Sequence, residues 1–232
     1  ALSAGLFDRD REVIQLHFGG GTPNFLSPAQ LRDVVDTLRS HFRFSDAADR
    51  DISIELDPRF VDADDIAALG KIGFNRASFG VQDFDPAVQK AVNRIQPLEM
   101  VEKAVEESRK ANFQSINADL IYGLPKQTLK SFGHTLDSLI RIAPDRIALY
   151  NYAHLPQRFK AQRLINDSDM PSAEARLQIF LMSMQRLLEA GYVYIGLDHF
   201  SKPDDELNQA RLDKSLHRNF QGYTTRAECD LI

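Results

Sequence analysis

With 232 residues, of which 43% are hydrophobic and 26% charged, the chain can bury a substantial core as one large or two ordinary domains. Its net charge of −5 and its scattered Lys and Arg argue against nucleic acid as a partner, so small molecules are expected instead. No apolar run reaches the roughly 18 residues of a membrane span and no signal-like N-terminus is present, so a cytoplasmic location is expected.

Short apolar or β-branched segments predict six strands, at residues 13–18, 52–56, 76–81, 116–122, 146–152 and 192–197. Helical patterns occupy residues 28–42, 62–71, 98–111, 128–142 and 173–190 between them. The alternation of strands and helices predicts an α/β fold with a mainly parallel sheet and helices outside it. That fold is either an open doubly wound sheet or all or part of a (β/α) barrel.

The first and last predicted helices have clear sequence signals. Ser27 and Gln30 form a capping box around Pro28 at the start of the first helix. Gly191 ends the last helix. One face of that last helix is predicted to carry Leu177, Leu181, Met184 and Leu188.

The C-terminal ends of the predicted strands carry glycine or polar residues. These are Gly19 to Thr22, Glu55 and Asp57, Gln82 and Asp83, Asp119, Asn151 and Tyr152, and Asp198 and His199. In parallel α/β folds such ends form one rim where ligands bind. Glu55 and Asp119 lie within apolar runs, where a carboxylate is costly unless it meets a ligand or partner. The sequence therefore predicts a ligand site on this rim.

Several chemistries do not fit that rim. The GGGTP segment matches neither a P-loop nor G-x-G-x-x-G, and the chain has no G-x-S-x-G elbow. The six histidines form no close pair, and Cys229, the one cysteine, cannot build a disulfide or a Cys-only metal site. What remains is bare backbone beside carboxylates and amides, which suits an amino acid or a ribose.

The chain resembles the radical S-adenosylmethionine enzymes, in particular the oxygen-independent coproporphyrinogen III oxidases. The motifs that carry the resemblance are GGGTP, ISIELDP, FGVQDF, VNR, ADLIYGLPKQT and YNYAHLP. DHFSKPDDEL and HRNFQGYTT favour the oxidases over the related haem chaperones. The resemblance implies an incomplete, TIM-like (β/α)6 partial barrel over residues 1–200, lacking its first strand and cluster loop. Residues 201–232 would form a post-barrel segment that leads into a C-terminal helical domain.

The same resemblance implies two sites for S-adenosylmethionine. In the first, Gly20, Gly21 and Thr22 would contact the amino and carboxylate groups of its methionine part, and Glu55 would bind the same molecule. Arg94 is suited to pairing the carboxylate of the second molecule. The residues that match positions around that second molecule are Gln82, Arg94, Asp119, Ala153 through its backbone, and Phe220 and Gln221, which would close the region.

The implied reaction is the oxidative decarboxylation of two propionates of coproporphyrinogen III, which gives protoporphyrinogen IX without oxygen. A [4Fe–4S] cluster would reduce S-adenosylmethionine to generate a 5′-deoxyadenosyl radical, while the protein aims the radical and binds the porphyrinogen. The resemblance further implies an electron donor of flavodoxin or ferredoxin type and a monomer. It assigns no catalytic residue.

One departure from the family is decisive for the isolated chain. The cluster cysteines, spaced C-x-x-x-C-x-x-C, should precede Ala1, and Cys229 cannot replace them. We therefore interpret the chain as the central portion of a longer oxidase, inactive by itself and with an exposed sheet edge. Two alternatives stay open. One is a cluster-less relative that binds porphyrin or haem. The other is an aldolase-like barrel with a Lys Schiff base, although no predicted strand contains a lysine.

Overall fold

The computed structural model describes residues 5, 11–219 and 222–230. The chain divides into two compact units. Unit 1 comprises Ala1–Gly80, Glu102–Ile116 and Asp230–Ile232, and unit 2 comprises Val81–Val101 and Asn117–Cys229.

Unit 1 is built on parallel strands. β2 (Gln15–Phe18) pairs with β4 (Asp51–Leu56), and β4 pairs with β5 (Arg76–Gln82), which begins in this unit. The register places His17 opposite Ser53 and Glu55 opposite Ser78. Two short strands, β1 (Glu12–Val13) and β3 (Arg43–Phe44), form a separate parallel pair.

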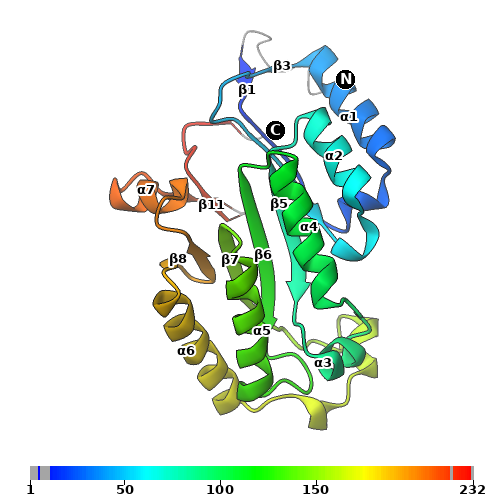
Figure 1. Ribbon diagram of the computed structural model, residues 1–232, viewed down its shortest axis with the longest axis vertical. Helices are drawn as coiled ribbons and strands as arrows, with labels where there is room; N and C mark the ends of the chain where they lie inside the picture. The colour runs from blue at the N-terminus through cyan, green and yellow to red at the C-terminus, as the bar shows by residue number, and fades with distance from the viewer. Residues whose placement is uncertain (1–4, 6–10, 220–221, 231–232) are drawn as a thin grey trace. The chain divides into compact units, whose positions relative to one another are not determined.

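Helices α1 (Pro28–His41) and α2 (Ala63–Ile72) pack beside each other along the strands of unit 1 (Figure 1). Each begins with a capping box, which in α1 is the predicted pair Ser27 and Gln30. α4 (Leu98–Lys110) lies mostly in unit 1. The short helix η2 (Pro23–Phe25) follows the glycine segment after β2, and η3 (Pro58–Phe60) follows Asp57 at the end of β4. The helices predicted at 28–42, 62–71 and 98–111 and the strands predicted at 52–56 and 76–81 are therefore confirmed. The strand predicted at 13–18 is interrupted at Ile14, and its first part, β1, pairs with β3 instead of β4.

Unit 2 contains most of β6 (Ser115–Tyr122), which pairs in parallel with β7 (Arg146–Asn151). The last predicted strand, found as β8 (Val193–Gly196), does not pair with β7. Instead β9 (His199–Ser201), which the sequence pattern does not predict, pairs antiparallel with both β7 and β8. The reason is a tight reversal, in which Gly196 and Leu197 adopt positive φ values of 145° and 49°. His199 therefore begins a returning strand rather than a loop.

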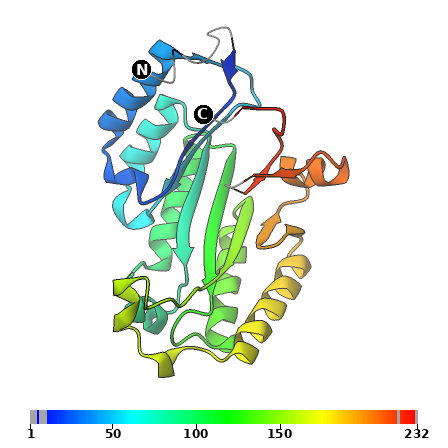
Figure 2. The same ribbon diagram turned by 180° about the vertical axis from the view of Figure 1, so that it is seen from behind.

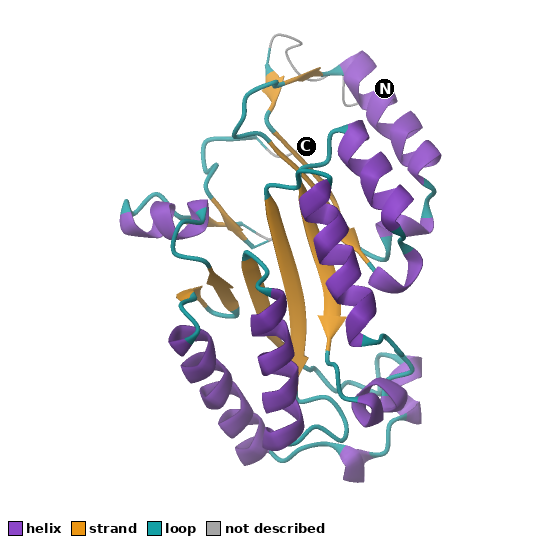
Figure 3. Ribbon diagram, viewed as in Figure 1, coloured by secondary structure: helices purple, strands orange, loops and turns teal. Residues whose placement is uncertain are grey.

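Helices α5 (Leu129–Ile142) and α6 (Ala173–Glu189) pack against each other (Figure 3). Seen from behind, β6 and β7 lie in front of α5 (Figure 2). The unit also contains elements that were not predicted. They are α3 (Pro86–Ala91), α7 (Glu206–Leu212), η4 (Lys160–Leu164), η5 (Asp167–Asp169) and the antiparallel pair β10 (His217–Arg218) and β11 (Tyr223–Thr224).

The apolar face predicted for α6 is not its core face. Leu177, Leu181 and Leu188 are 56%, 55% and 49% exposed, whereas Ile179 and Leu187 are fully buried. Apolar residues lie on more than one side of this helix, so periodicity alone cannot identify the side that packs. Every helix in the described ranges is too short or too polar to cross a bilayer.

Candidate functional site

The three glycines after β2 have different structural roles. A Cβ atom added to Gly19 would lie 2.2 Å from Nε2 of His17, so this position must be bare for the imidazole to fit. Gly20 and Gly21 have φ values of 74° and 66°, in the left-handed region that favours glycine. Both are exposed, and a Cβ atom on either would meet none of the described atoms within 4 Å. Their backbone is thus open to the ligand that the sequence predicts.

Glu55 on β4 directly contacts this glycine segment. The Gly20 N–H donates to its Oε2 at 3.1 Å, and its Oε1 lies 3.4 Å from Nε2 of His17. The hydrogen bond from His17 is the main reason that the pKa of Glu55 lies below its ordinary value, while partial burial opposes that shift. Two predicted site residues are therefore in contact, because the Gly20 N–H binds the anionic carboxylate of Glu55.

Asn24 fixes the loop that follows Thr22. Its Nδ2 donates to the carbonyls of Asp57 and Phe60 at 3.0 and 3.1 Å, and its Oδ1 accepts from the Asp57 N–H at 3.1 Å. Thr22 is the N-cap residue of η2, although its side chain makes no capping bond. Sequence reasoning missed Asn24 and the role of His17. The available signal was their position beside the glycine segment.

Gln82, at the end of β5, has a conformation that is unusual for its residue type. Its φ is 65°, and a left-handed backbone costs a non-glycine residue about 1 to 2 kcal/mol. Its Oε1 is buried and has no hydrogen-bond partner among the described residues. Such strain and an unsatisfied buried acceptor are typical of ligand sites. Both features support the prediction that Gln82 binds a ligand.

The next residue, Asp83, is 1% exposed and anchors a buried hydrogen-bond network. Its Oδ1 accepts from the Asp85 N–H and the Thr135 hydroxyl, each at 2.7 Å, and its Oδ2 accepts from Gln127 Nε2 at 2.6 Å. Burial raises the pKa of Asp83 in spite of these three donors. The network joins the end of β5 to α5 and to the loop after β6.

The other predicted residues of the second site come from separate segments of unit 2. The Arg94 N–H donates to the Gln89 carbonyl at 2.8 Å, after α3. Asp119 on β6 accepts a 2.8 Å hydrogen bond from Asn117 Nδ2. The Ala153 carbonyl, after β7, accepts from Gln162 Nε2 at 3.0 Å. Phe220 and Gln221 lie outside the described residues.

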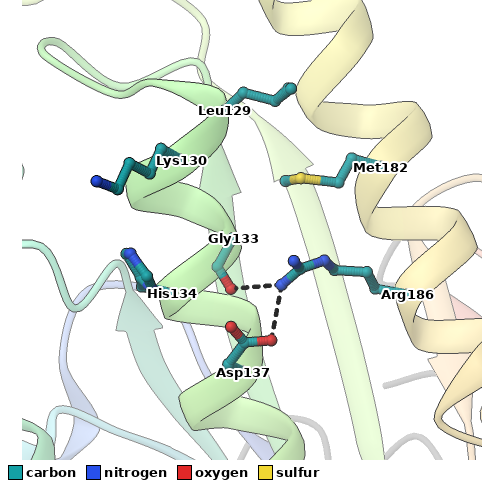
Figure 4. A pocket seen from close by; sticks show the side chains of 7 residues that line it. All are labelled: Leu129, Lys130, Gly133, His134, Asp137, Met182 and Arg186. Carbon is teal, nitrogen blue, oxygen red and sulfur yellow. Dashed lines mark hydrogen bonds and ion pairs between the residues drawn. The ribbon is translucent and has the colours of Figure 1, made fainter.

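A groove of about 360 Å³ lies between α5 and α6 but includes none of the predicted site residues (Figure 4). Across this groove, Arg186 Nη1 donates hydrogen bonds to the Gly133 carbonyl at 2.9 Å and to Asp137 Oδ1 at 2.7 Å. The remaining lining residues are Leu129, Lys130, His134 and Met182. The groove is a feature of helix packing and is separate from the strand ends.

The side chains suit S-adenosylmethionine better than an iron–sulfur cluster. Glu55 and the exposed glycine backbone offer acceptors and donors for the charged groups of an amino acid. Iron–sulfur clusters are held mainly by cysteine thiolates, and the chain has one cysteine. Across residues 11–219 and 222–230, no group of three or more His, Cys, Asp or Glu side chains could hold a metal ion. These residues therefore do not fit a [4Fe–4S] cluster.

Parallel strands flanked by helices define an α/β protein, and the carboxylate bound to a glycine loop lies at the strand ends, where such folds bind ligands. The chain belongs to the radical SAM superfamily, because the model of that family matches residues 4–139, more than half of the chain. The predicted α/β fold is confirmed as well.

Curated relatives support the resemblance to one group of these enzymes. The oxygen-independent coproporphyrinogen III oxidases of Pseudomonas aeruginosa and Escherichia coli are 53% and 49% identical to the chain over 97% and 96% of its length. The matches cover 49% and 48% of those proteins, so the chain spans about half the length of the relatives.

Solved structures agree with this result. The coproporphyrinogen III oxidase of Escherichia coli, a radical SAM enzyme, superposes on the chain with a TM-score of 0.95 and 49% identity. The match covers 99% of this chain and 52% of the length of that enzyme. The Elp3 protein of Methanocaldococcus infernus matches 78% of the chain with a TM-score of 0.58 and 16% identity, a likeness of fold alone.

Proposed function

We propose that the chain is the central part of an oxygen-independent coproporphyrinogen III oxidase. The full protein would decarboxylate two propionates of coproporphyrinogen III to vinyl groups and release protoporphyrinogen IX. The observation that carries this proposal is the likeness to the Escherichia coli enzyme over 99% of the chain at 49% identity. The strained Gln82 and the carboxylate of Glu55 beside an open glycine backbone are compatible with it.

In this proposal, unit 1 holds the methionine part of one S-adenosylmethionine. The exposed backbone of Gly20 and Gly21 and the neighbouring Thr22 would contact its amino and carboxylate groups. Glu55 would accept a hydrogen bond from its ammonium or its ribose hydroxyls. When bound in this family, the molecule supplies the radical that begins the reaction.

Unit 2 would contribute residues to the binding site of a second S-adenosylmethionine molecule. The Gln82 amide has an unused buried acceptor for a donor of the ligand. The Arg94 guanidinium suits a carboxylate, and the Asp119 carboxylate suits an ammonium or a hydroxyl. Ala153, Phe220 and Gln221 belong to the same proposed site.

The cluster and the other partners belong to the full protein. Three thiolates would come from a segment outside this chain, and an electron donor of flavodoxin or ferredoxin type would supply electrons. The full protein would be monomeric and cytoplasmic. Within this chain, the barrel core would end at residue 200 and the post-barrel segment would follow.

The direct test begins with the natural polypeptide that contains this chain. Its sequence is expected to carry C-x-x-x-C-x-x-C ahead of Ala1. The full-length protein, with its cluster reconstituted without oxygen, should convert coproporphyrinogen III to protoporphyrinogen IX when S-adenosylmethionine and a reductant are supplied. Absence of the cysteine motif from the natural polypeptide, with porphyrin or haem binding but no conversion, would show that the protein is a binding protein and not an oxidase.

A further inference from the structure

We propose that His17 is a positioning residue, whose imidazole holds the Glu55 carboxylate against the glycine segment in the orientation that binds S-adenosylmethionine. The inference rests on the proposed function of Glu55. Everything that carries it lies within unit 1, on β2, β4 and the loop after β2.

The strand register brings the imidazole to the carboxylate. His17 lies opposite Ser53, and Glu55 is two residues further along β4, on the same face of the sheet. His17 Nδ1 is 3.0 Å from Ser53 Oγ, and Nε2 is 3.4 Å from Glu55 Oε1. Both ring nitrogens therefore have a partner.

The hydrogen-bond pattern favours a proton on Nε2 whether the imidazole is neutral or charged. A neutral ring with its proton on Nε2 can donate toward Glu55 and accept from the Ser53 hydroxyl through Nδ1. A charged ring donates at both nitrogens, and the Ser53 hydroxyl can then turn to the Leu16 carbonyl at 3.5 Å. In both states His17 presents a donor to Glu55.

Both oxygens of the Glu55 carboxylate have a partner in the protein. Oε1 faces His17, while Oε2 accepts the hydrogen bond of the Gly20 N–H. The Glu55 side chain is nevertheless 44% exposed. Because a carboxylate has about four acceptor positions, each oxygen keeps one for a ligand.

Gly19 shows that the loop is shaped around this imidazole. A Cβ atom there would be 2.2 Å from His17 Nε2 and 2.9 Å from Glu55 Oε1. Atoms cannot approach so closely, so any side chain at this position would displace the ring or the carboxylate. The first glycine of the segment therefore makes room for a side chain of the protein, whereas the next two leave their backbone open.

The arrangement also has an electrostatic consequence. Among the described residues, the groups that act on the Glu55 carboxylate are His17 from β2 and the Gly20 amide from the loop, while Ser78 lies opposite Glu55 in the register of β5. His17 is the main cause of the lowered pKa of Glu55. Without the imidazole, that pKa should rise toward its ordinary value, and the carboxylate should lose its charge at a higher pH.

The test is equilibrium binding of S-adenosylmethionine to the full-length protein, measured by calorimetry as the pH is lowered while circular dichroism confirms the fold. His17→Ala should weaken binding at neutral pH by roughly three- to tenfold. It should also move the acid midpoint of binding to higher pH. His17→Gln, which keeps an N–H donor, should recover part of the neutral affinity. His41→Ala, at the exposed end of α1, is the matched control and should behave like wild type.

Gly19→Ala provides an independent route, because it displaces the imidazole while the histidine remains. It should shift the acid midpoint in the same direction, and it carries the test if His17→Ala does not fold. Unchanged affinity and midpoint in folded His17→Ala or Gly19→Ala, together with weak binding by Glu55→Gln, would overturn the role of His17 alone. Wild-type binding by Glu55→Gln would overturn both that role and the proposed function of Glu55.

Discussion

The Asp83 carboxylate at the end of β5 accepts a 2.6 Å hydrogen bond from the Gln127 side-chain amide in the loop after β6. Gln127 Oε1 in turn accepts from the N–H groups of Gly123 and Leu124 at 2.6 and 3.1 Å. One buried pair of side chains thus fixes the backbone next to Gln82 and the backbone that follows β6.

Removal of that carboxylate should destabilise the protein strongly. Asp83→Ala leaves the donors of Thr135, Gln127 and the Asp85 backbone without their acceptor in a buried place. We expect a loss of at least about 2 kcal/mol, visible as a lower melting temperature of the full-length protein. Asp204→Ala, at an exposed turn, is the control and should melt like wild type. Equal melting temperatures for the two variants would show that the network contributes little.

Stability should also depend on the protonation of Asp83. Because burial raises its pKa in the folded protein, the folded state binds this proton more tightly than the unfolded state. The resulting stabilisation is present below the unfolded pKa and is lost as the pH rises through the folded pKa. The stability of wild type relative to Asp83→Asn should therefore fall as the pH rises from acid to neutral. Melting temperatures of both proteins over that range test the sign, and a difference that grows with pH would contradict it.

The backbone strain at Gln82 can be separated from its ligand contact. Gln82→Ala and Gln82→Gly both remove the amide, but only glycine relieves the left-handed conformation. We expect both variants to bind the second S-adenosylmethionine more weakly in a calorimetric titration. The glycine variant should be more stable than the alanine variant by about 1 kcal/mol. Full binding of two molecules by both variants would remove Gln82 from the proposed site.

Two helical glycines should respond differently to alanine. At Gly133 in α5, a Cβ atom would meet Arg186 at 3.5 Å, an ordinary contact. Gly133→Ala should therefore stabilise the protein by about 0.5 to 1 kcal/mol. At Gly70 in α2, a Cβ atom would lie 3.0 Å from the Ala111 carbonyl, so Gly70→Ala should be less stable than Gly133→Ala. Chemical denaturation compares the pair, and the reverse order would show that the backbone at Ala111 yields easily.

Local sequence was sufficient for much of the fold. The capping box of Ser27 and Gln30 and the apolar runs of β4 and β5 act over a few residues, so these elements could be predicted from the residues themselves. The glycine segment and the carboxylate of Glu55 could likewise be singled out as candidate site residues, because bare backbone and a charge within an apolar strand are both unusual.

Tertiary structure decided the contacts that join distant segments. Whether Leu177 or Ile179 of α6 is buried depends on what packs against the helix, since apolar residues lie on more than one of its sides. The position of β9 between β7 and β8 depends on a chain reversal at Gly196 and on pairing with a strand some fifty residues earlier. The contact of His17 with Glu55 follows from the register of two paired strands. Spacing along the chain does not encode that register. The register brings the His17 imidazole beside Gly19, which is why that position must be glycine.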